Sequence, residues 1–155
     1  MRTHVSVQQA DFDVAALQAE LQTDAAAVGA IATFTGYVRG GQGDSVISAL
    51  ELEHYPGMTE TSIEHILRDS AQRWPLLAAT VVHRIGILEP GAQIVWVGVS
   101  AGHRGDAFAA CEFIMDYLKT RAPFWKKESG AGGSRWVDAR DSDNARAARW
   151  QAQGE

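Results

Sequence analysis

Two long runs of β-forming residues, 79–88 and 93–101, flank the tripeptide Glu89-Pro90-Gly91. Proline presets one turn dihedral and glycine accepts a positive φ, so the tripeptide predicts a tight turn between two strands. The two runs are therefore expected to pair as an antiparallel hairpin, which any fold of this chain has to accommodate.

The rest of the chain alternates between strand-like and helical segments. Further strands are predicted at residues 4–7, 30–38 and 46–54. The last two are expected to form a second hairpin, with the glycine-rich residues 40–44 as a flexible flap. A mobile loop at residues 129–134, a short strand at Trp136 and Val137, and helical turns at residues 145–150 complete the pattern.

Three helices are predicted from apolar residues at helical spacing. The first carries Val14, Leu17 and Leu21 and takes Asp11 or Asp13 as its N-cap. The second spans residues 58–74 before Pro75, and the third spans residues 106–120 before Pro123. With 155 residues and no internal repeat, the chain is expected to be one α+β domain, residues 1–155, of mainly antiparallel hairpins and about three helices.

Composition excludes several classes of function. A net charge of -5 and a pI near 5.5 argue against general nucleic-acid binding. No apolar run is long enough to cross a membrane, and the N-terminus lacks an export signal, so a soluble protein is expected. The single Cys111 fits a reducing cytoplasm. The five histidines show no metal-binding spacing, and no metal is expected.

Four cations interrupt this acidic background within residues 119–127: Lys119, Arg121, Lys126 and Lys127. Their concentration suggests a pocket for an anion. Two aromatics, Phe124 and Trp125, lie beside the last two lysines and can form a partly dry wall that strengthens attraction to an anion. The alternatives are solvated lysines on a surface turn at 126–127, and an exposed ion pair of Lys119 with Asp116 or Glu112.

The two faces of the third helix are expected to differ. Its apolar stripe is predicted to be buried and consists of Phe108, Cys111, Ile114, Met115 and Leu118. Its polar stripe consists of Glu112, Asp116 and Lys119. Cys111 is therefore interpreted as a core residue, because a reactive thiolate needs cationic surroundings or a helix N-terminus.

Other candidate site residues follow predicted strands. Arg39 precedes the glycine-rich loop, and His103 and Arg104 precede the third helix, whose free N–H groups can bind an anion. The alternative for all three is a solvated strand end. Glu51 and Glu53 are split from His54 across the two faces of a strand and are interpreted as structural.

Four segments of the sequence, residues 34–39, 50–58, 83–86 and 113–128, resemble the large, catalytic subunit family of molybdopterin synthase. The resemblance extends from about residue 28 to residue 150, and residues 1–27 match only loosely. It implies the α/β-hammerhead fold of that family. It also implies a sulfur transferase that converts cyclic pyranopterin monophosphate (precursor Z) to molybdopterin in molybdenum cofactor biosynthesis, without a permanently bound cofactor.

The resemblance also implies the partners. The sulfur arrives as a thiocarboxylate on the C-terminal Gly-Gly of a small ubiquitin-like subunit, which explains why this chain needs no nucleophilic cysteine. Family enzymes are heterotetramers with a central homodimer of the large subunit. Neither nucleic acid nor a membrane is an expected partner.

Carried onto matching residues, the resemblance assigns catalysis to Lys119 and Lys126. It assigns the substrate pocket to these two lysines together with Tyr37, Val38, Arg39, His103, Arg104, Lys127 and Glu128. Arg39, His103 and Arg104 would hold the phosphate and pterin oxygens, since arginine suits bidentate phosphate contact. Arg140 is a candidate for a neighbouring subunit's pocket.

Two other functions remain open from the residues alone. One is a non-catalytic scaffold that binds a Gly-Gly-tailed partner or a phosphorylated metabolite. The other is an enzyme acting on coenzyme A thioesters, which has less support because no catalytic carboxylate is recognisable on a helix. Formation of a dithiolene product distinguishes the expected enzyme from both.

Overall fold

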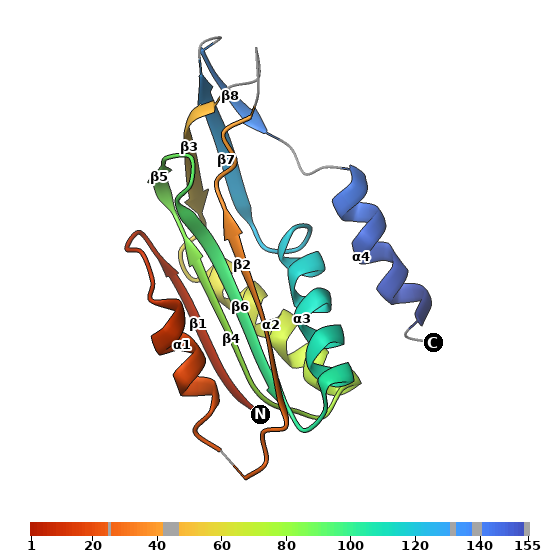
Figure 1. The fold of residues 1–155 in the computed structure, drawn as a ribbon. Coiled ribbons are helices and arrows are strands. Elements are labelled where there is room, and N and C mark those ends of the chain that lie inside the picture. The colour runs from red at the N-terminus through yellow and green to blue at the C-terminus, as the bar shows by residue number, and fades with distance from the viewer. Residues whose placement is uncertain (25, 42–46, 131–132, 138–140, 154–155) are drawn as a thin grey trace.

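The computed structural model describes every residue except 25, 42–46, 131–132, 138–140 and 154–155. The described residues form two four-stranded sheets and four helices (Figure 1). The strands are β1 (Arg2–Gln8), β2 (Ala30–Tyr37), β3 (Ile47–His54), β4 (Leu76–Arg84), β5 (Gly86–Leu88), β6 (Gln93–Ala101), β7 (Phe124–Gly130) and β8 (Gly133–Val137). The helices are α1 (Val14–Leu21), α2 (Met58–Arg73), α3 (Arg104–Leu118) and α4 (Asp141–Gln153). The α+β class is confirmed.

The first sheet has the strand order β1-β4-β6-β2 and contains the expected central hairpin. β4 and β6 are antiparallel, with Val81 opposite Val97. Their connection includes the predicted turn, in which Gly91 has a φ of 89° and the Ala92 N–H donates to the Glu89 carbonyl at 3.0 Å. β2 pairs with β6 antiparallel, whereas β1 adds to β4 in parallel.

The predicted hairpin between residues 30–38 and 46–54 is wrong. β2 and β3 belong to different sheets, because β3 pairs with β5 and β7 in a second sheet of order β5-β3-β7-β8. Two backbone bonds turn the chain after β2: the Val38 N–H donates to the Ala92 carbonyl at 2.9 Å, and the Gly91 N–H donates to the Val38 carbonyl at 2.8 Å. These bonds tie Val38 to the β5–β6 turn rather than to a returning strand.

Two further predictions about strands need correction. The run 79–88 divides at Gly86, whose φ of 88° favours glycine, and β5 then crosses to the second sheet. Residues 129–134 are not a loop throughout, since Ser129 in β7 pairs with Ser134 in β8 and Gly130 pairs with Gly133. The short strand predicted at Trp136 and Val137 is confirmed as the end of β8.

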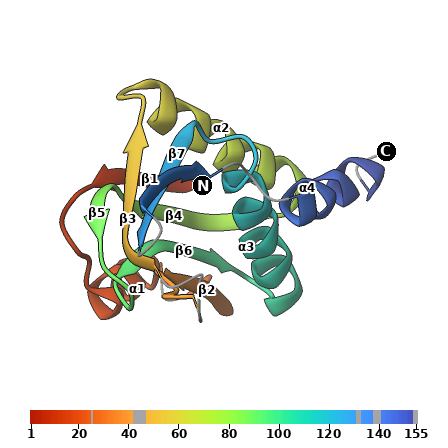
Figure 2. The same cartoon turned by 90° about the horizontal axis from the view of Figure 1, so that it is seen from above.

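Helices cover both faces of the first sheet (Figure 2). On one face, Val81 and Val97 pack with Ile63 of α2 and Ile114 of α3 in the main core. On the other, Trp96 packs with Ala78 and with Leu21 of α1. α4 lies outside α3, away from the sheet (Figure 2). The layers explain why β4 and β6 are apolar along nearly their whole length, because both of their faces are buried.

The ends of the helices follow local sequence signals. The Asp13 carboxylate accepts from the N–H groups of Ala15 and Ala16 at 3.0 and 3.2 Å, so Asp13 and not Asp11 is the N-cap of α1. α2 ends at Arg73, two residues before Pro75, as predicted. α4 is longer than the turns predicted at 145–150. Among the described residues, no helix is long and apolar enough to cross a membrane.

Candidate functional site

Lys119 is the C-cap residue of α3, where its backbone N–H donates to the Met115 carbonyl at 3.2 Å. The helix stops here because the next residues lead into Pro123 and β7. Lys119 is exposed, and its ammonium is close enough to His83 of β4 to lower the pKa of that imidazole. The end of α3 therefore lies over the C-terminal end of β4.

Lys126 lies in β7, so the alternative of a surface turn at 126–127 is wrong. Side chains alternate along β7, which places Lys126 and Glu128 on the face of Phe124. The Phe124 ring stacks on His83, with 3.9 Å between ring centroids and an interplanar angle of 20°. Lys126 thus shares the face that meets His83, the residue influenced by Lys119.

Lys127 occupies the opposite face of β7. Its ammonium lies 5.7 Å from the ring centroid of Trp136, and the neighbouring residue on that face, Trp125, packs on Tyr55 at 4.2 Å. The aromatics therefore do not form one wall with both lysines. Of the pair, the structure directs only Lys126 toward the side of Lys119.

The segment from Tyr37 to Arg39 reaches this region through Val38. Val38 is buried with Leu50 and Leu52 of β3, whose partners across the strand pair are Glu128 and Lys126. Tyr37 and Arg39, on either side of Val38, are exposed. The buried valine thus anchors the backbone before Arg39 on β3, the strand that pairs with β7 and Lys126.

A pocket of about 420 Å³ adjoins Lys119. It lies between β2, α3 and α4, and its lining residues are Ala32, Thr33, Phe34, Phe108, Cys111, Glu112, Met115, Asp116, Lys119, Asp143 and Arg146. Phe108 lines it with 67% of its surface exposed, so its predicted place in the core is wrong. The buried stripe of α3 is rotated toward Ala107, Ala110 and Phe113, and Phe108 faces the pocket instead.

Cys111 reaches the pocket wall but is a poor nucleophile. It is buried, as predicted, and burial raises the pKa of its thiol to about 12. The nearby Glu112 carboxylate adds to this shift. At neutral pH the thiolate is essentially absent, so no sulfur chemistry starts from this residue.

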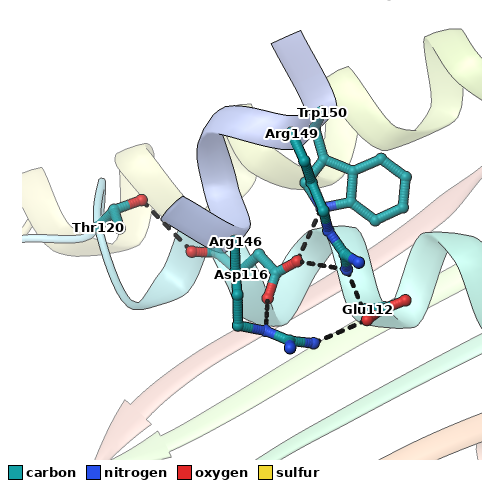
Figure 3. A network of polar contacts seen from close by, with 6 residues as sticks. All are labelled: Glu112, Asp116, Thr120, Arg146, Arg149 and Trp150. Carbon is teal, nitrogen blue, oxygen red and sulfur yellow. Dashed lines mark hydrogen bonds and ion pairs between the residues drawn. The ribbon is translucent and has the colours of Figure 1, made fainter. Parts of the chain in front are cut away.

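Asp116 departs from its predicted position on a polar stripe. It is only 6% exposed, and α4 covers it (Figure 3). Its carboxylate accepts from Arg146 Nε at 3.2 Å, from Arg149 at 3.1 Å and from the Trp150 indole N–H at 2.7 Å. Both arginines also contact Glu112. The signal in the sequence was the spacing of Arg146, Arg149 and Trp150, which places all three on one helix face.

His103 and Arg104 lie at the other end of α3. As predicted, they follow a strand and begin a helix: His103 is the N-cap and Arg104 the first residue, and both are exposed. However, a helix of 15 residues is about 22 Å long, so these residues and Lys119 do not share a pocket within one chain (Figure 1). The pocket predicted from the resemblance thus includes residues from both ends of α3, and its composition stays a prediction.

The remaining predictions concern Arg140, the glycine-rich loop, metal binding and the glutamates of β3. Arg140 lies outside the described residues, as do residues 42–46 of the glycine-rich loop. No cluster of three or more histidine, cysteine or carboxylate side chains that could hold a metal ion occurs among the described residues. Glu51 and Glu53 lie on the face of β3 opposite His54, as predicted. Side chains alternate along the strand, and Leu50 and Leu52, which share the face of His54, are buried in the core.

These features define an α+β protein with a lysine-bearing site at one end of α3 and no reactive thiol in it. Residues 7–121 match the family model described as "MoaE protein". The chain is 56% identical over 146 residues to the molybdopterin synthase catalytic subunit of Ralstonia nicotianae, covering 94% of this chain and 83% of that protein. The chain belongs to the MoaE family of molybdopterin synthase catalytic subunits.

Similarity to solved structures supports the assignment to this family. The molybdopterin biosynthesis MoaE protein of Burkholderia ambifaria superposes with a TM-score of 0.83 at 51% identity, covering 97% of this chain and 99% of that one. A protein–protein complex of subunits 1 and 2 of molybdopterin-converting factor from Helicobacter pylori contains a chain with a TM-score of 0.69 at 21% identity, with coverage of 88% and 90%. That more distant likeness concerns the fold alone.

Proposed function

We propose that this chain transfers sulfur to cyclic pyranopterin monophosphate and so forms the dithiolene of molybdopterin. The observation that carries the proposal is a pair of lysines, Lys119 and Lys126, directed to one side of a site whose only cysteine is a buried thiol with a pKa of about 12. Such a site can stabilise anions but has no sulfur nucleophile of its own. The sulfur therefore comes from outside the chain, and the resemblance to the family implies a thiocarboxylate on a partner.

The lysines provide electrostatic stabilisation and proton transfer. When a thiocarboxylate sulfur attacks a substrate carbon, negative charge develops on the atoms that accept the electron pair, and an ammonium held nearby lowers the barrier. The same groups can deliver or accept protons as sulfur replaces oxygen. We assign these roles to Lys119 and Lys126 jointly.

The phosphate is assigned to the arginines. Arg39, next to the Val38 that packs on β3, binds the cyclic phosphate of a substrate whose reacting carbons face Lys126, and Tyr37, Val38 and Glu128 line the same region. His103 and Arg104 are about one helix length away from Lys119, so they complete the site of a second copy of the chain. The functional unit is accordingly a homodimer with composite sites. Lys127 faces away and has no substrate role in this arrangement.

The sulfur donor is a small ubiquitin-like subunit with a C-terminal Gly-Gly. The family supports a partner, because its members are named catalytic subunits of molybdopterin synthase, a name that implies at least one other subunit. A central homodimer with one small subunit at each end gives the heterotetramer. The chain retains no cofactor between turnovers, and the free Cys111 suits a cytoplasmic location.

The test combines binding and chemistry. The purified chain is mixed with its thiocarboxylated small subunit and with cyclic pyranopterin monophosphate, and molybdopterin is quantified. Co-elution of the two proteins together with a dithiolene product supports the proposal. Co-elution without product supports the alternative of a non-catalytic scaffold.

A further inference from the structure

His83 of β4 lies where several elements of the candidate site meet. Side chains alternate along β4, so His83 lies on the face covered by α2 and α3, together with the core residues Ala79 and Val81. Its ring stacks on Phe124, the first residue of the strand that carries Lys126. No role in the proposed reaction has so far been given to it.

Hydrogen bonding fixes the tautomer of this histidine. His83 Nδ1 lies 2.8 Å from the Arg84 carbonyl oxygen, which can only accept a hydrogen bond. Nδ1 therefore carries the proton. In the neutral imidazole the other nitrogen, Nε2, then keeps its lone pair and is an acceptor.

The surroundings hold the imidazole neutral. Burial lowers the pKa of His83 to about 4, and the positive charges of Lys119 on α3 and His54 on β3 add to this effect, while the bond to the Arg84 carbonyl opposes it. His54 in turn contacts Glu60 of α2, with 3.4 Å between Nε2 and Oε1. At neutral pH, His83 thus presents an acceptor, not a second cation, to its charged neighbours.

We propose that His83 is a positioning residue for Lys119: its Nε2 accepts a hydrogen bond from the Lys119 ammonium and holds that ammonium on the side of β7 that carries Lys126. Such a weak base does not remove the lysine proton. It keeps Lys119 charged and oriented, as a group that stabilises developing negative charge has to be. This role rests on the proposed function of Lys119.

Two substitutions distinguish the role of Nδ1 from that of Nε2. His83→Asn keeps a donor near the Nδ1 position but has no group at Nε2, whereas the longer side chain of His83→Gln can place an acceptor there. His83→Leu also lacks an acceptor and serves if the asparagine variant does not fold. His65→Asn, at an exposed position on α2, is the matched control.

The first readout does not depend on turnover. Each protein is treated with acetic anhydride at pH 8, and acetylation of Lys119 is measured by mass spectrometry relative to Lys127 on the opposite face. Loss of the acceptor raises the fraction of free amine, so Lys119 is expected to react about tenfold faster in His83→Asn and His83→Leu. The rate in His83→Gln and His65→Asn should stay within about twofold of wild type.

The second readout is molybdopterin formation with the thiocarboxylated small subunit. His83→Asn is expected to lower kcat at least about tenfold with little change in KM, and His83→Gln to restore most of kcat. Equal effects of the asparagine and glutamine variants, or unchanged Lys119 acetylation in the variants without an acceptor, would overturn the role of His83. If the wild-type protein makes no product, the proposed function fails, and the acetylation rates still decide whether His83 positions Lys119.

Discussion

Asp116 illustrates, at the scale of a single residue, how a charged side chain leaves its predicted solvent face. Helical spacing alone puts it beside Glu112 and Lys119 on a polar stripe. Its partners Arg146, Arg149 and Trp150 lie about 30 residues later in the chain, so their spacing places them on one helix face but does not show that this face packs on Asp116. A buried carboxylate is stable there because three donors replace its water.

The Asp116→Ala substitution is expected to destabilise the docking of α4. It removes a buried bond from the Trp150 indole and contacts from two arginines whose side chains are 53% and 40% exposed, and solvent weakens the latter. We expect the free energy of unfolding in urea to fall by about 2 kcal/mol. Glu112→Ala, which breaks only the more exposed contacts, should cost less than about 1 kcal/mol. Equally small losses of unfolding free energy in Asp116→Ala and Glu112→Ala would contradict the assigned role of Asp116.

His83 should make stability fall in acid. Its native pKa is about 4 and its unfolded value is near 6.5, so between these values the unfolded chain binds more protons. Its contribution is complete above pH 6.5 and is lost as the pH falls toward 4. From pH 7.5 to 4.5 the wild-type protein should lose about 2 kcal/mol more than His83→Gln. Parallel unfolding free energies for the two proteins over this range would refute the expectation.

At the scale of elements, the sequence predicted which segments are helices and strands better than it predicted their pairing. The turn at Glu89-Pro90-Gly91 was correct, and the N-cap was one of the two predicted aspartates, because each signal depends on neighbouring residues. The pairing of β2 with β6, and of β3 with β7, depends on contacts between distant segments. Sequential order favoured a β2–β3 hairpin, and the bonds of Val38 to the β5–β6 turn prevented it.

The same limit applies to the candidate site. The grouping of Lys119, Lys126 and Arg39 in one site stays a prediction, and the structure adds that Val38 packs on Leu50 and Leu52, whose partners in β7 are Glu128 and Lys126. The contrasting faces of Lys126 and Lys127 could not be predicted while the segment was read as a turn. The role inferred for His83 required the stacking contact with Phe124, which joins segments about 40 residues apart.

The junction between β2 and α3 depends on the absence of a side chain at Gly29. A Cβ there would lie 2.0 Å from the Gly102 carbonyl oxygen, while the Gly29 N–H donates to Ala101 at 2.9 Å. Gly29→Ala should therefore lower the free energy of unfolding by about 2 kcal/mol or more. Gly105→Ala, in α3 with nothing within 4 Å of its added Cβ, should instead stabilise by roughly 0.5 kcal/mol. Urea unfolding measures both, and a Gly29→Ala protein as stable as wild type would contradict the close approach.

At the scale of the whole molecule, the length of α3 separates His103 and Arg104 from the lysines and so favours a composite site in a homodimer. Co-expression tests this arrangement. Chains carrying Lys119→Ala and chains carrying Arg104→Ala should each be nearly inactive alone. Random pairing of the two should restore about a quarter of wild-type activity, because half of the dimers are mixed and each has one intact site.

A matched pair gives the control. Lys119→Ala and Lys126→Ala chains alter the same half of the site, so their mixed dimers contain no intact site and activity should not return. Restoration by this second pair, or by neither pair, would show that the two halves of the site are not divided between subunits as proposed.

The most direct test of sulfur transfer at the lysine site is single-turnover conversion of cyclic pyranopterin monophosphate by the Lys119→Ala protein with thiocarboxylated small subunit. Folding and partner binding are confirmed first, so that the rate reports on the chemistry. We expect product formation to slow by about a hundredfold or more, because an ammonium that stabilises developing charge has been removed. Turnover close to that of the wild-type protein would contradict the central role of Lys119.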